Sequence, residues 1–312
     1  MIRLLLKRLL QAAFVAWAVG TISFVLVRMM SSDIAFRVAA GRYGYDNVDA
    51  AAAQAVSEEL GLDRPGWQLY LHWLWELANF NLGNSLVSGL PVAHEIGHLL
   101  GHSLLLAFIA ILFATLIAFP VGLYAAMHAN GWFDRLALFA SSILRAQPVF
   151  VIGLILLLIF ALQLKLLPVA GFYDIRYVVL PGIALALALA AVSNRIVRHS
   201  AFDTINSAFF RFARIKGLSY PQSLVRHGFR NMAVPVIAFM GIQLIALIEG
   251  IVMIESLFSW PGIGHGLAHA IFSRDVPMIQ GTALTMGLIF VVLNLLVDIA
   301  CHVIDPRGRR AA

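Results

Sequence analysis

The chain has 312 residues, of which 61% are apolar and only 12% are charged. Soluble domains are nearer half apolar and one quarter charged, so this composition excludes an ordinary water-soluble protein. The net charge of +6 reflects the membrane topology and gives no reason to expect nucleic-acid binding. The single cysteine, Cys301, excludes a disulfide framework and a thiolate metal cluster.

Six apolar stretches are each long enough to cross a hydrocarbon core, which takes about 20 residues of α-helix. They cover residues 9–27, 104–127, 136–162, 177–192, 233–254 and 278–303. Spanning helices satisfy their own backbone hydrogen bonds, and these runs lack the alternation of β-barrel strands. The predicted fold class is therefore an all-α polytopic membrane protein with six transmembrane helices. A cleaved signal peptide is the alternative for residues 1–40, but the apolar run exceeds a typical signal core, so we expect a retained span.

Charge predicts the orientation of these helices, because Lys and Arg gather in cytoplasmic loops. Basic residues cluster at both termini, at Arg135 after the second span, and in a long loop at residues 194–232. Residues 31–101 instead carry eight acidic residues against three arginines. Both termini are therefore expected in the cytoplasm. The expected segments are 1–30 with the first span, an external insertion at 31–101, a core membrane domain at 102–305 and a tail at 306–312.

The external insertion combines a helix-prone stretch with an aromatic one. Residues 48–60 are rich in alanine, and Pro65-Gly66 separates them from the aromatic stretch. That stretch, residues 67–77, holds three tryptophans and one tyrosine, which is typical of a helix at the membrane interface. A cap that contacts an external partner is the alternative interpretation.

His94-Glu95-Ile96-Gly97-His98 matches H-E-x-x-H, the signature of zinc metalloproteases. Histidines four residues apart on a helix can share one zinc ion, and the glutamate between them can activate a water. The position of a third, metzincin-type histidine is occupied by Leu104. We therefore favour the polar face of an amphipathic helix that enters the membrane. An intramembrane zinc protease using His94, Glu95 and His98 is the alternative from another class.

The loop at residues 194–232 is both long and strongly basic. It contains seven Lys and Arg residues against one acid, Asp203. Its length accommodates two short amphipathic helices around a turn at Gly217, which is more than a connector requires. We infer that a cytoplasmic partner docks on this loop. A helix lying on anionic lipid headgroups is the alternative.

Part of this loop carries a family pattern. It reads Phe210-Arg211-Phe212-Ala213-Arg214-Ile215-Lys216-Gly217-Leu218-Ser219, then Arg226-His227-Gly228-Phe229-Arg230-Asn231, then Pro235. This pattern resembles the cytoplasmic loop of permease subunits in binding-protein-dependent ABC importers, above all the dipeptide, oligopeptide and nickel branch. Arg211 and Phe212 stand where the broader family has Glu and Ala. Further matches are Pro120-Val121-Gly122-Leu123, Pro148 with Phe150 and Gly153, Glu255 with Phe258, Pro261, Gly262 and Gly264, and Asn294, Asp298 and Asp305-Pro306-Arg307.

The resemblance implies a type I ABC importer permease fold in the bacterial inner membrane, forming half of a translocation pathway for di- or oligopeptides. It implies a second related permease subunit, two cytoplasmic ABC ATPase subunits and an external solute-binding protein as partners. No G-x-x-x-x-G-K-[ST] loop occurs in the chain, so we expect a transport subunit rather than an enzyme. ATP is then bound by the partner subunits, and no cofactor or metal is expected here. A nickel or metal-chelate importer is the alternative within transport.

The resemblance also assigns an ATPase-coupling site. The helix before the loop glycine, expected at residues 204–216, is a coupling helix that sits in a groove of the ATPase. The coupling residues are Phe210, Arg211, Phe212, Ala213, Arg214, Lys216 and Gly217. Gly217 can adopt the left-handed turn that ends a helix. The expected packing anchors are Phe209, Phe210, Phe212 and Ile215.

The predicted residues of the translocation pathway and gate are Glu249, Gln147, Pro148, Glu255, Pro261 and Gly262. Glu249 lies in mid-span, where a carboxylate needs water, a partner or a proton. The alternative to a pathway role is a hydrogen bond from protonated Glu249 to another helix. Glu255 is expected to cap the Pro261-Gly262 turn. Arg145 joins Gln147 beside Pro148, which is expected to kink the third span.

Overall fold

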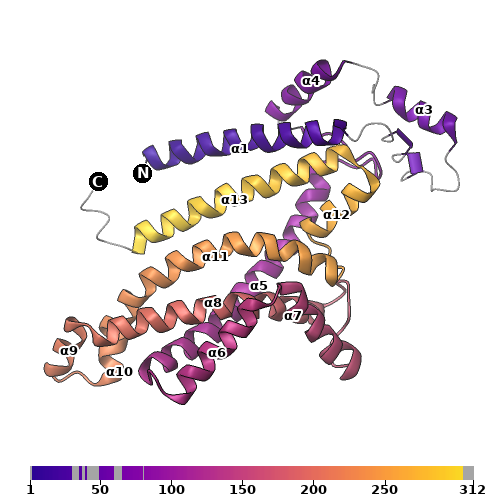
Figure 1. Cartoon of the computed structure of the whole chain (residues 1–312). Helices are drawn as coiled ribbons and strands as arrows, with labels where there is room; N and C mark the ends of the chain where they lie inside the picture. The colour runs from indigo at the N-terminus through magenta and orange to yellow at the C-terminus, as the bar shows by residue number, and fades with distance from the viewer. Residues whose placement is uncertain are drawn as a thin grey trace. The chain divides into compact units, whose positions relative to one another are not determined.

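The computed structural model describes residues 2–29, 35–36, 39–40, 49–59, 65–79 and 81–304, and most of them are helical (Figure 1). The α-helices are α1 (Ile2–Met29), α3 (Ala50–Glu59), α4 (Gly66–Ala78), α5 (Val92–Met127), α6 (Trp132–Ala146), α7 (Val149–Leu156), α8 (Val179–Asn206), α9 (Ala208–Ile215), α10 (Tyr220–Ser223), α11 (Phe229–Leu257), α12 (Ile263–Ser273) and α13 (Val276–Ile304). Two π-helical segments, η3 (Leu157–Gln163) and η5 (Leu224–Gly228), and the 3₁₀ turn η4 (Ile175–Val178) complete them.

Within the described residues, four helices are long and apolar enough to cross a membrane by themselves. They cover Leu6–Leu26, Val92–Met127, Ile175–Asn206 and Val276–Ala300. The bent pair Trp132–Ala146 and Val149–Gln163 makes a fifth if it is counted as one span. The predicted fifth span lies on α11, where Asn231–Leu244 forms a shorter apolar stretch. The helical membrane class is thus confirmed, whereas the total of six spans stays a prediction.

The expected kink in the third span is a complete break. α6 ends at Ala146, Gln147 takes an extended conformation with ψ of 137°, and α7 starts after Pro148. The two halves meet at 103°. Proline disfavours helical geometry in the residue before it and has no N–H to continue the hydrogen-bond ladder, so the helix stops. The kinked helix predicted for residues 136–162 is therefore two separate helices, α6 and α7.

The chain forms two compact units. The first comprises Met1–Ser103 with Pro261–Val291, and the second comprises Leu104–Trp260 with Val292–Ala312. These units are defined by contacts within the chain. The sequence-based boundary between an external insertion and a core domain rests instead on hydropathy and charge, and it stays a prediction.

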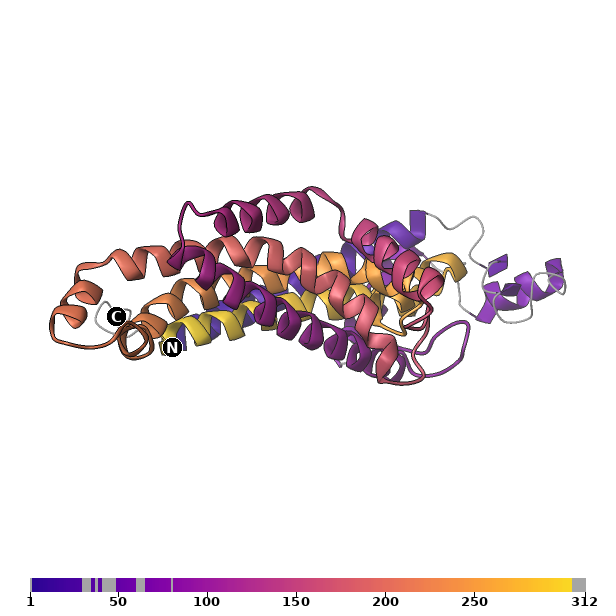
Figure 2. The same ribbon diagram turned by 90° about the horizontal axis from the view of Figure 1, so that it is seen from below.

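The second unit is built around α8, which contacts α6, α7 and α11 (Figure 2). Small side chains let the helices approach closely, as is typical of membrane helix pairs. A Cβ at Gly122 of α5 would lie 2.8 Å from the carbonyl oxygen of Asn194, which shows how near the two backbones run. The buried core joins alanines of α5 and α8 to apolar residues of α11, among them Ala114, Ala186 and Ile254.

Polar contacts set the alignment of α6 along α8. Arg198 donates from Nε and Nη2 to the two carboxylate oxygens of Asp134, at 2.5 and 2.6 Å. Further along the same pair of helices, the amide of Asn194 donates to the hydroxyl of Ser141 at 2.9 Å. Because Asp134 is buried, the two-fold hydrogen bonding compensates the desolvation of its charge.

The first unit joins the N-terminal helices to α12 and α13. The hydroxyls of Thr21 on α1 and Tyr70 on α4 are 2.8 Å apart, so the predicted aromatic helix exists and packs on the first span. Asp275 accepts from the hydroxyl of Ser85 at 2.5 Å. The hydroxyl of Ser103 accepts from the backbone N–H of Ile263 at 2.8 Å, which fixes the start of α12.

Candidate functional site

Helix α9 begins later than the sequence suggests. Ser207 is extended, with φ of −69° and ψ of 154°, and its hydroxyl accepts from the backbone N–H of Phe210 at 3.4 Å. That hydrogen bond makes Ser207 the N-cap of a helix over Ala208–Ile215. Residues 204–206 instead form the last turn of α8. The predicted start at residue 204 is therefore wrong. Residues on both sides of Ser207 have similar helix propensity, so only the serine cap marks the boundary between α8 and α9.

The end of α9 confirms the expected glycine turn. Gly217 has φ of +90°, and its N–H donates to the carbonyl of Arg214 at 3.0 Å. The N–H of Leu218 donates to the carbonyl of Ala213 at 3.3 Å, so together the two bonds form a Schellman motif. The guanidinium of Arg214 also donates to the carbonyl of Leu218 at 2.9 Å. The turn after the helix is thus held by both backbone and side chain.

The inner face of α9 attaches it to the rest of the second unit. Phe210 is only 2% exposed and Ala213 is also buried. Phe210 meets the ring of Tyr220 edge-on at 5.5 Å, and partial burial raises the pKa of that tyrosine. The residues that share its buried cluster are Ala126, Ala201, Leu224 and Met232. Phe210 therefore packs within the chain, and the expectation that it is an anchor for a partner is revised.

The outer face of α9 carries an exposed apolar stripe. Phe209, Phe212 and Ile215 recur at every third position and are 44%, 56% and 81% exposed. We call these three residues the outer stripe. The basic side chains beside it are Arg211, Arg214 and Lys216, all exposed. Lys216 places its Nζ 4.6 Å from the ring centroid of Phe212, so cation and stripe form one continuous surface.

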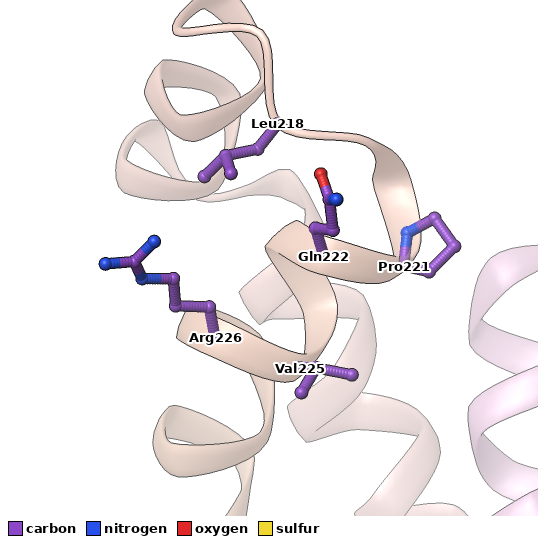
Figure 3. Close-up of a pocket in the computed structure, with 5 residues that line it drawn as sticks. All are labelled: Leu218, Pro221, Gln222, Val225 and Arg226. Atoms are coloured by element: carbon purple, nitrogen blue, oxygen red, sulfur yellow. The ribbon is translucent and has the colours of Figure 1, made fainter.

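A groove that the sequence reasoning missed lies just after the glycine turn. It has a volume of about 430 Å³ and is lined by Leu218, Pro221, Gln222, Val225 and Arg226. Figure 3 shows these side chains coming from the turn after α9, from α10 and from η5. Ser219 and Gln222 form a capping box that starts α10. The spacing Ser-x-x-Gln, a helix-start signature, is the signal that could have located this second short helix.

A cavity of about 520 Å³ lies in the second unit at the break between α6 and α7. Gln147 and Pro148 line it together with Arg145, so the structure brings these three predicted residues together. Gln243 of α11 also lines the cavity and was missed, because nothing in the sequence links it to residues 145–148. Its amide donates to the carbonyl of Leu189 at 3.0 Å.

Of the other predicted pathway residues, Glu255, Pro261 and Gly262 do not line this cavity. Glu249 lies on α11, but its side chain is outside the described part of the structure. Glu255 is fully buried, and its backbone carbonyl accepts from the N–H of Trp260 at 2.8 Å. Pro261 and Gly262 precede α12 in the first unit, with Gly262 as the N-cap residue. A role of Glu255 in capping that turn stays a prediction.

The H-E-x-x-H residues lie on α5 without forming a ligand set. Glu95 accepts a hydrogen bond from Ser88. The ring of His98 contacts that of His102, with centroids 4.9 Å apart. Among the described residues, which include the whole motif, no three His, Cys, Asp or Glu side chains are grouped closely enough to hold a metal ion. The protease alternative is therefore unsupported.

Comparison with known proteins agrees with this geometry. Residues 118–310 match the family model of the binding-protein-dependent transport system inner membrane component, and residues 1–87 match the N-terminal model of the same kind of protein. The glutathione transport system permease protein GsiC of Escherichia coli K12 is 33% identical over 309 residues, covering 99% of both chains. The protein of the same name in Pectobacterium atrosepticum is 34% identical with the same coverage. The chain therefore belongs to the inner-membrane components of binding-protein-dependent transport systems, the permease subunits of ABC importers.

Proposed function

We propose that this permease forms half of the translocation pathway for small peptides, with glutathione-like tripeptides as the first candidates. The supporting observation is a similarity to glutathione permeases that runs over 99% of the chain and so includes every segment that could line a pathway. The second half of the pathway is supplied by a related permease subunit. An external solute-binding protein delivers the peptide, and two cytoplasmic ATPases bind ATP.

The outer stripe of α9 is the surface on which an ATPase docks. Three large apolar side chains stand exposed on one face of a short helix, and such a face is used when an amphipathic helix lies in a groove of a partner. Arg211, Arg214 and Lys216 surround the stripe and favour a groove with an acidic rim. This exposed stripe is the observation that carries the coupling role.

The inner face of α9 and its glycine turn transmit the motion. Phe210 and Ala213 fasten α9 to the second unit, so a displacement of the outer stripe moves the helices behind it. The Schellman motif at Gly217 holds the helix end in one geometry before the partner binds, which lowers the conformational cost of docking. Alternating access then results from ATP-driven movement of this loop, with the loop and both termini in the cytoplasm.

The test compares two isoleucines in the importer reconstituted with its binding protein and ATPases. Ile215→Asp places a charge in the outer stripe, whereas Ile175→Asp changes an exposed isoleucine of η4 outside the loop. We expect Ile215→Asp to lower binding-protein-stimulated ATP hydrolysis and glutathione uptake roughly tenfold, as for an interface hot spot of about 1.4 kcal/mol.

The control Ile175→Asp should retain both activities. Membrane levels of the two variants are measured by immunoblot so that a loss of protein is not read as a loss of coupling. Normal stimulation of ATP hydrolysis in Ile215→Asp would contradict docking on the outer stripe. Absence of glutathione or dipeptide uptake by the wild-type assembly would contradict the proposed substrate class.

A further inference from the structure

The cavity at the α6–α7 break has the properties of a site for a small solute. Its volume of about 520 Å³ lies within the range of ligand pockets, roughly 300–1,000 Å³. Most of its wall is apolar, with side chains such as Leu185, Leu189 and Leu247. The polar exceptions converge from two helices: Arg145 and Gln147 at the break, and Gln243 on α11. A few placed polar groups in an apolar wall are what fixes the orientation of a bound molecule.

Arg145 lines the cavity beside the middle of an apolar helix that is long enough to cross a membrane. The α8 residues that line the same cavity run from Leu185 to Val192, in the middle of the apolar stretch Ile175–Asn206. A cation within a membrane span is costly, and ionisable residues found there face a partner or a water-filled pathway. The side chain of Arg145 is exposed in this chain, so it is open to a solute.

The described lining of the cavity includes Arg145 and no Asp or Glu. Elsewhere among the described side chains of the second unit, Arg176 pairs with Asp174, Arg198 with Asp134, and His199 with Asp203. The guanidinium of Arg145 matches a carboxylate geometrically, because it can donate two parallel hydrogen bonds. In the same cavity wall, the side-chain amide of Gln243 is held by its hydrogen bond to the carbonyl of Leu189.

We propose that Arg145, together with Gln147 and Gln243, forms a carboxylate-binding subsite in the translocation pathway. It takes the C-terminal carboxylate of a small peptide-like solute on the guanidinium, while the glutamine amides meet its peptide groups. This inference rests on the proposed function and adds a selectivity step within the permease itself, after release from the binding protein. The contact must be weak, because a pathway site has to release what it binds.

The experiment measures selectivity in proteoliposomes that contain the complete importer. The probes are glutathione and its glycine ethyl ester, each supplied with the same binding protein, and the readout is the ratio of their uptake rates per ATP hydrolysed. Because every permease variant uses the same binding protein, a change in this ratio relative to wild type reports the permease alone. Arg145→Gln should lower the acid-to-ester ratio roughly tenfold, the loss of one ion-paired contact of about 1.4 kcal/mol.

The matched control is Arg176→Gln, which removes an exposed arginine that pairs with Asp174 and does not line the cavity. Its ratio should equal that of wild type, and this control should keep binding-protein-stimulated ATP hydrolysis. Arg145→Lys keeps the charge without the planar fork, so its ratio should lie between those of wild type and Arg145→Gln.

Three results would overturn the subsite. An unchanged ratio in Arg145→Gln would show that the guanidinium does not bind the C-terminal carboxylate of the solute. If that variant fails to assemble, Arg145→Met is measured in its place, and an unchanged ratio there would have the same meaning. Restoration of the wild-type ratio by a second change, Glu249→Gln, would show that Arg145 serves a carboxylate of its own chain. Failure of the wild-type importer to take up either probe would instead count against the proposed function.

Discussion

Gly217 determines how α9 ends, and its backbone conformation is one that favours glycine. Its φ of +90° is a conformation that residues with a Cβ rarely adopt, yet a Cβ there would meet nothing within 4 Å. The effect of a substitution is therefore conformational and not steric. Alanine should cost roughly 1–2 kcal/mol locally. Proline is worse, because it also removes the N–H that bonds to Arg214 and cannot adopt positive φ.

We expect Gly217→Pro to reduce binding-protein-stimulated ATP hydrolysis at least tenfold in the reconstituted importer, and Gly217→Ala to reduce it less. Gly89 provides the control, since it has φ of +74° and equally open surroundings but lies outside the coupling loop. Gly89→Ala should leave stimulation unchanged. Full coupling in Gly217→Pro would refute the role of this turn.

Among the helices, the pair α6 and α7 shows how one proline shapes a cavity. Because Gln147 is extended before Pro148, α6 stops and the polar residues at its end line the cavity instead of continuing around a helix. Pro148→Ala removes the constraint on Gln147 and lets α6 propagate into α7. We expect glutathione uptake per ATP hydrolysed to fall several-fold as the polar residues turn away from the cavity.

Pro168→Ala is the matched change, because Pro168 lies in the loop after η3 and does not line the cavity. It should retain normal uptake. The prediction is checked by measuring uptake and ATP hydrolysis in the same proteoliposomes, so that loss of transport is separated from loss of coupling. Equal uptake per ATP in wild type and Pro148→Ala would mean that the break does not shape the pathway.

For the chain as a whole, charge makes a prediction about orientation. The loop that contains α9 should be cytoplasmic and the loop before α8 should be external, because Lys and Arg concentrate on the cytoplasmic side. Ile215 and Tyr173 are strongly exposed and mark these two loops. In a Cys301→Ala background, a membrane-impermeant maleimide should label Tyr173→Cys in intact spheroplasts and Ile215→Cys only after permeabilisation. The reverse labelling pattern would contradict the assigned topology.

Much of the fold is predictable from local sequence patterns, but their limits are visible at particular residues. Hydropathy locates the spans, and the glycine in the basic loop locates the end of α9. The predicted start of that helix is too early, because Thr204 to Asn206 have the same helical character whether they belong to α8 or to α9. At Gln147 the sequence predicts only a kink, since proline chemistry indicates a disturbance but not an angle of 103°.

The sequence alone determined the membrane class, the basic loop, the family pattern and the coupling helix with its glycine turn. It could do so because hydropathy, charge and capping act between residues that are close in the chain. Tertiary structure decided which side of α9 is available to a partner. Phe210 and Phe212 differ little in sequence context, but one packs against Leu224 and Met232 and the other is exposed. It also decided that Gln243 and Arg145 line one cavity. Such an arrangement depends on contacts between distant segments, which no local pattern encodes.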